Sequence, residues 1–92
     1  MLTVPAPVSA ETLAERIGAA LRGAWADQRH ATKRLSRRVN ADPRAVENWM
    51  SGRCAPRAAE LVRLMAECDA VRAEIETLIQ EARAARAMDP HV

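Results

Sequence analysis

The chain contains 92 residues, of which 49% are hydrophobic and 28% charged, and its formal net charge at pH 7 is +2. A chain of this length forms one small domain with a modest core, which leaves little room for the pocket of several hundred cubic ångströms that a small-molecule substrate occupies. Alanine is abundant, β-branched residues are scarce and the only aromatic residues are two tryptophans. The composition therefore predicts an all-α fold, a compact bundle of about five helices.

No segment of the sequence points to secretion or to a membrane. Residues 1–8 contain Pro5 and Pro7 and are predicted to be disordered, and they have neither the charged start nor the long apolar core of a signal peptide. No apolar run approaches the length that spans a bilayer. Cys54 and Cys68 are isolated, and the histidines are not at metal-ligand spacing. We therefore expect a cytoplasmic protein with reduced cysteines and no metal or cofactor.

The first predicted helix runs from about residue 10 to residue 24. Ser9 precedes it as a suitable N-cap. Apolar residues recur along it at every fourth position: Leu13, Ile17, Leu21 and Trp25. Trp25 is predicted to anchor this helix against the next two helices, a role that we favour over stacking on nucleic-acid bases. Gly18 and Gly23 either weaken the helix or permit close packing against it.

Two short helices with a tight turn between them are predicted next, the first from Ala31 or Thr32 to residue 39 and the second over residues 43–51. Asn40 tolerates the left-handed backbone conformation that such a turn needs. Asp42 is a preferred N-cap, and Pro43 is preferred at the first helical position. The apolar faces of the two helices are predicted to pack together through Leu35, Val39, Val46, Trp49 and Met50.

Two further helices are predicted over residues 58–67 and 70–87, followed by a disordered tail at 88–92. The helix over 58–67 closes the core with Leu61, Leu64, Met65 and Cys68. The helix over 70–87 is acidic and carries an apolar stripe: Val71, Ile75, Leu78, Ile79 and Ala82. We expect this last helix to pack back on the first one, and pairing with a second copy of the chain is the alternative.

Positive charge is concentrated in the middle of the sequence. Residues 29–63 contain nine basic and three acidic residues, whereas the segments on either side carry a small net negative charge. A basic surface over a pair of short helices is typical of a protein that binds nucleic-acid phosphates. The alternative, a basic face that is merely solvated, is less favoured because the charge coincides with the two-helix pattern.

The same region resembles the lambda-repressor-like helix-turn-helix family, of the Cro or xenobiotic-response-element type. The matching residues are Lys33-Arg34-Leu35-Ser36, Val39, Asn40-Ala41-Asp42, Val46, Trp49, Gly52, Pro56, Leu61, Leu64 and Met65. The resemblance covers roughly residues 30–66. The sequence departs from the family at Asn40, where Gly is usual, at Ser36, where Ala is usual, and at Arg57, where Ser or Thr often opens the next helix.

The resemblance implies that the helix over 43–51 lies in the major groove of double-stranded DNA. The residues implied to read bases are Pro43, Arg44, Glu47 and Asn48. Arg44 is suited to guanine and Asn48 to adenine, and Pro43 offers an apolar contact. Glu47 either accepts a hydrogen bond from cytosine or orients Arg44, and we favour the second role.

The phosphate-binding candidates surround that helix. They are Thr32, Lys33, Arg37, Ser51, Arg53 and Arg57. Thr32 stands where family members hold a phosphate, and a simple N-cap role is compatible with that. Arg34 and Arg38 are expected to form surface ion pairs instead.

The function predicted from these residues is sequence-specific DNA binding by a bacterial or phage transcriptional regulator, associated with the nucleoid. One such module reads few base pairs, so we expect either a homodimer, with residues 70–87 as its candidate surface, or a partner protein bound alongside. The main alternative is a protein-interaction module that docks on RNA polymerase or on another regulator. A non-specific nucleoid binder is a further alternative, and no Ser/His/Asp, Cys/His or metal constellation supports an enzyme.

Overall fold

The computed structural model describes residues 8–27 and 29–87, and this part of the chain is helical without any strand. The helices in chain order are α1 (Ala10–Trp25), α2 (Ala31–Val39), α3 (Pro43–Met50), α4 (Ala58–Glu67) and α5 (Asp69–Ala87). The predicted all-α bundle of about five helices is confirmed. The two segments predicted to be disordered, 1–8 and 88–92, lie outside the described residues apart from Val8.

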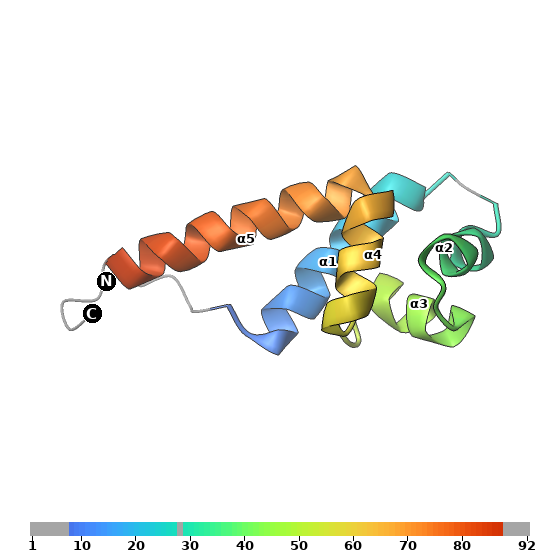
Figure 1. Ribbon diagram of the computed structural model, residues 1–92, viewed down its shortest axis with the longest axis horizontal. Helices are drawn as coiled ribbons and strands as arrows, with labels where there is room; N and C mark the ends of the chain where they lie inside the picture. Colours follow the sequence, from blue (N-terminus) through green and yellow to red (C-terminus); the bar gives the residue numbers. More distant parts are fainter. Residues whose placement is uncertain (1–7, 28, 88–92) are drawn as a thin grey trace.

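Helix α1 lies in the middle of the fold and contacts both α3 and α5. Helix α2 contacts α3 and α4, and α4 leads directly into α5. Figure 1 shows the consequence for the overall shape: α2 and α3 form one end of the molecule, and α5 runs along α1 toward the other end. The acidic helix α5 therefore does not lie over α3.

Several helix ends have the caps that the sequence predicts. The Ser9 Oγ accepts a hydrogen bond from the Thr12 backbone N at 3.1 Å, and the Asp42 Oδ1 accepts one from the Arg44 backbone N at 2.8 Å. Pro43 occupies the first turn of α3. Asn40 ends α2 in the left-handed region with a φ of 52°, as predicted for the turn. These caps satisfy backbone groups that would otherwise lack partners at the helix ends.

The core lies between α1 and the α2–α3 pair. Its buried apolar residues come from all five helices or their ends: Ile17, Leu21, Leu35, Val39, Val46, Trp49, Leu64, Cys68 and Val71. The predicted packing of α2 against α3 is thus observed, with Met50 half-buried at the edge of the core. Each fully buried Leu, Ile or Val side chain contributes about 1.5–3 kcal/mol relative to exposure.

Helix α1 crosses α3 closely at Gly18. A Cβ atom at Gly18 would lie 2.9 Å from the carbonyl O of Trp49 and 3.0 Å from the backbone N of Gly52. Gly18 thus permits close packing, one of the two roles predicted for it. A Cβ atom at Gly23 would meet nothing within 4 Å, so Gly23 has no such role.

Helix α5 packs back on α1, as expected. Arg16 of α1 bonds two carboxylates of α5: its Nε donates to Glu74, and its Nη2 donates to the Glu81 Oε2 at 2.8 Å. The hydrogen bonding of Glu81 to Arg16 lowers the pKa of Glu81 below its usual value. Only part of the predicted apolar stripe faces inward, because Val71 and Leu78 are buried whereas Ile79 is 45% exposed.

Candidate nucleic-acid interface

The candidate interface is built on α2, α3 and the three-residue turn between them. The backbone N of Ala41 donates to the carbonyl O of Ser36 at 3.0 Å, which closes the end of α2 and reverses the chain. Ser36 itself is buried, and its Oγ donates to the carbonyl O of Lys33. A small residue at this position lets α2 and α3 approach each other. The turn therefore sets the direction in which α3 leaves the core.

One face of α3 is fixed in the core and the other is uncovered. Val46 and Trp49 are buried, whereas Pro43, Arg44 and Glu47 are exposed and Asn48 is half-buried. The four residues predicted to read bases therefore lie together on α3, three of them fully exposed and Asn48 at the edge of the buried face. This is the arrangement that an inserted helix requires.

The polar side chains on this face are not used inside the protein. Within residues 8–27 and 29–87, the side chains of Arg44, Glu47 and Asn48 make no hydrogen bond or ion pair with another residue. The expected orientation of Arg44 by Glu47 is accordingly absent from the protein alone. The three side chains keep their full hydrogen-bonding capacity for a ligand.

The C-terminal end of α3 is held from α1. An Nη1 of Arg22 donates to the carbonyl O of Met50, and the Oγ of Ser51 donates to the carbonyl O of Asn48 at 3.1 Å. Gly52 follows with a φ of 77°. A cationic donor at this end also interacts favourably with the helix dipole. Helix α3 is thus fixed along its inner face and at both ends.

Helix α2 presents basic side chains beside α3. Lys33 and Arg37 are exposed and lie one helical turn apart, as phosphate-binding candidates should. Arg38 lies with its guanidinium carbon 5.8 Å from the ring centroid of Trp25, so it makes a cation–π contact rather than the expected surface ion pair. This contact joins α1 to α2, and it agrees with the anchoring role predicted for Trp25.

Thr32 does not cap α2. The N-cap residue is His30, whose φ is 58°, and it makes no side-chain capping bond. Thr32 is half-buried, and its Oγ1 lies 3.8 Å from the Sδ of Met50 in α3. The N-cap role considered for Thr32 is therefore wrong, because the chain enters α2 two residues earlier and this hydroxyl faces α3.

The loop after α3 carries two of the predicted phosphate-binding residues, Arg53 and Arg57, and both are exposed. Arg53 lines a shallow surface hollow together with Glu11 and Glu15 of α1, so nearby carboxylates reduce the positive potential there. Arg57 is the N-cap of α4, and its backbone N donates to the Glu60 Oε1 at 3.2 Å, which leaves its guanidinium exposed. Of the two, Arg57 is the better placed to bind an anion.

Two arginines have structural roles that the sequence did not predict. Arg63 is one of the nine basic residues of the central region, but its Nε donates to the carbonyl O of Val39 at 2.7 Å and so caps α2 from α4. Arg22 does the same for α3 from α1. No sequence signal identifies these pairs, because the partners are 24 and 28 residues apart and belong to different helices.

Comparisons of this chain with protein-family models, with curated proteins and with solved structures return no match. What the structure establishes is therefore the class of fold, a small all-α bundle. None of its described helices is both long and apolar enough to cross a bilayer. Across residues 8–27 and 29–87, no three His, Cys, Asp or Glu side chains are grouped so that they could hold a metal ion.

Proposed function

We propose that this protein binds double-stranded DNA in a sequence-dependent manner and regulates transcription, with α3 inserted in the major groove. The observation that carries the proposal is the uncovered face of α3, where Arg44, Glu47 and Asn48 have no partner within the described part of the chain. Arg and Asn side chains recognise the major-groove edges of guanine and adenine through paired hydrogen bonds.

The surrounding charge supports the same function. Lys33 and Arg37 on α2 and Arg57 after α3 are exposed on elements that adjoin the α3 face. Basic side chains on both sides of a recognition helix bind the phosphates of the two strands and fix the orientation of the helix in the groove. The resemblance of residues 30–66 to the lambda-repressor-like family suggests the same placement. In this proposal Ser51 and Thr32 make only a minor contribution to phosphate binding, because each hydroxyl already has a partner in the protein.

The experiment selects bound sequences from a random pool of duplex DNA with the full chain, and then measures affinity for the selected site by fluorescence anisotropy. The double variant Arg44→Ala/Asn48→Ala is expected to lose at least about tenfold in affinity, since each good base contact contributes about 1–3 kcal/mol. Arg86→Ala, which removes one exposed arginine from α5, is the matched control and is expected to bind as the unaltered chain does.

Two outcomes would overturn the proposal. If no sequence is enriched while the chain still binds random DNA, the protein is a non-specific binder. If it binds no DNA although circular dichroism shows an intact helical fold, the α3 face serves a protein partner instead, such as RNA polymerase or another regulator. The double variant distinguishes the first of these outcomes from the proposal, because it would not alter non-specific binding by more than the loss of one charge.

A further inference from the structure

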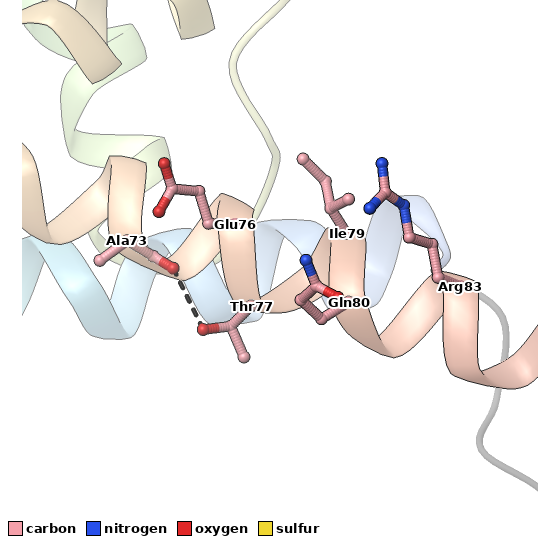
Figure 2. Close-up of a pocket in the computed structure, with 6 residues that line it drawn as sticks. All are labelled: Ala73, Glu76, Thr77, Ile79, Gln80 and Arg83. Atoms are coloured by element: carbon pink, nitrogen blue, oxygen red, sulfur yellow. Dashed lines mark hydrogen bonds between the residues drawn. The ribbon is translucent and has the colours of Figure 1, made fainter.

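The outer face of α5 carries an acid, an apolar residue and a base in order along the helix. Glu76, Ile79 and Arg83 project to the same side of α5 (Figure 2). This face lies opposite the one that carries Glu74 and Leu78, which is turned toward the body of the protein. Every residue that lines the hollow on this outer face belongs to α5, so no other described helix covers it.

Ile79 is the residue on this face that suggests a binding partner. Its side chain is 45% exposed, and it is the one large hydrophobic residue of α5 with such exposure in the described part of the chain. It lies between a carboxylate one turn before it and a guanidinium one turn after it. A surface of this composition is complementary to itself when it is turned end for end.

We propose that two copies of this chain associate through this face of α5, with the two helices antiparallel and a twofold axis close to Ile79. In this register Glu76 of each copy lies opposite Arg83 of the other, so the same ion pair forms twice, as a twofold interface requires. A parallel pairing would instead bring Glu76 against Glu76 and Arg83 against Arg83, which is repulsive.

The other side chains that this register brings opposite one another are compatible with it. Ile79 lies beside the uncharged Gln80 of the second copy and close to its Ile79, whereas Arg72 and Arg86 lie opposite alanines, Ala87 and Ala73. Within each copy Arg72 already bonds Glu76 at 3.5 Å, with both side chains well exposed. Only one large apolar residue of each copy is buried, so the association is weak and depends on the ion pairs. It leaves α2 and α3 uncovered, and it does not depend on the proposed DNA binding.

The test is a charge swap measured by sedimentation equilibrium of the full chain over a range of concentrations. Glu76→Arg alone and Arg83→Glu alone each place like charges across the interface, and each is expected to raise the dissociation constant of the dimer by at least about tenfold. The double variant Glu76→Arg/Arg83→Glu restores opposite charges and is expected to restore association to about that of the unaltered chain. Glu67→Arg, a charge reversal on α4, is the matched control and leaves the dimer unchanged.

The outcomes are decisive in both directions. A chain that remains a monomer at all concentrations overturns the proposal. A dimer that the single reversals do not weaken, or that the double variant does not restore, uses another surface or a parallel arrangement and also overturns it. The three substituted positions are exposed, so all four variants are expected to fold, and circular dichroism checks this for each. Fluorescence anisotropy with duplex DNA on the same samples measures separately whether each variant binds DNA.

Discussion

At the scale of single residues, the two glycines of α1 show how one residue type can be required at one position and dispensable five residues later. Gly18→Ala places a methyl group against two backbone atoms of the α3 end, at 2.9 and 3.0 Å. Overpacking of this kind costs about 1–3 kcal/mol, which outweighs the gain of about 1 kcal/mol in helix propensity. We expect a net loss of up to about 2 kcal/mol in the free energy of unfolding, measured by urea denaturation.

Gly23→Ala is the matched control for that measurement. Its methyl group would lie in open space, so the substitution should stabilise the protein by about 0.5–1 kcal/mol through the lower entropy of the unfolded chain. Equal effects of the two substitutions would mean that the close crossing of α1 and α3 does not exist in solution.

Arginines of this chain have two different kinds of role, and salt separates them. Arg63 caps α2 internally, whereas Arg37 is exposed on α2 without a bond to another described residue. If DNA binding is correct, Arg37→Gln reduces the slope of log affinity against log salt concentration by about one, with little effect on stability.

Arg63→Gln should do the reverse. It removes a cationic donor from a helix end, which costs about 1 kcal/mol in the free energy of unfolding, and it leaves the salt slope unchanged. Anisotropy titrations at several salt concentrations and urea denaturation of both variants provide the comparison. A reduced slope for Arg63→Gln would place that guanidinium on DNA rather than on Val39.

At the scale of the elements, the attachment of α5 to α1 is predicted to depend on pH. Glu81 accepts hydrogen bonds from both Nη atoms of Arg16, at 3.2 and 2.8 Å, and these lower the pKa of Glu81 in the folded state below its ordinary 4.5. A lowered folded-state pKa adds stability that is fully present above the unfolded-state pKa and is lost as the pH falls through the folded-state pKa.

Glu81→Gln should therefore lower the Tm at pH 7, and this difference should shrink as the pH falls through the folded-state pKa and the carboxylate of the unaltered chain takes up a proton. Thermal unfolding between pH 7 and pH 3 gives the difference in Tm at each pH. Glu15→Gln, which removes one exposed carboxylate from α1, controls for the change in net charge. A difference that persists undiminished at pH 3 would show that the Arg16 pair does not cause it.

At the scale of the whole molecule, local patterns predicted the helices well and long-range contacts could not be predicted. The bounds of all five helices agree with the sequence patterns to about one residue, because capping residues such as Ser9, Asp42 and Asn40 act within a single turn. The packing of α2 on α3 followed from their apolar spacing. The Arg16 bonds to α5 join residues 58 and 65 positions apart, and nothing local in the sequence encodes them.

Ile79 belongs to the predicted apolar stripe but does not face inward, for a related reason. It follows Leu78 by one residue, so it lies about 100° further around the helix. Among the described helices, α5 packs mainly against α1 and α4, and these cover a narrow stripe through Val71 and Leu78. The sequence shows the spacing of apolar residues, but the width of the covered stripe depends on how many neighbours a helix has. The base-reading and phosphate-binding assignments stay predictions until DNA is bound.

The two tryptophans give the protein two built-in spectroscopic reporters, one in the core and one at the contact between α1 and α2. Trp49 is 2% exposed in the core, whereas Trp25 is half-buried beneath Arg38 where α1 meets α2. The chain contains no tyrosine and no phenylalanine, so its near-ultraviolet absorption and emission come almost entirely from these two indoles. In a Trp25→Phe variant the emission would follow the burial of Trp49 alone, and its red shift would mark the loss of the core. The difference between the emission of this variant and that of the unaltered chain would then report on the environment of Trp25, and so on the packing of α1 against α2, without an added dye.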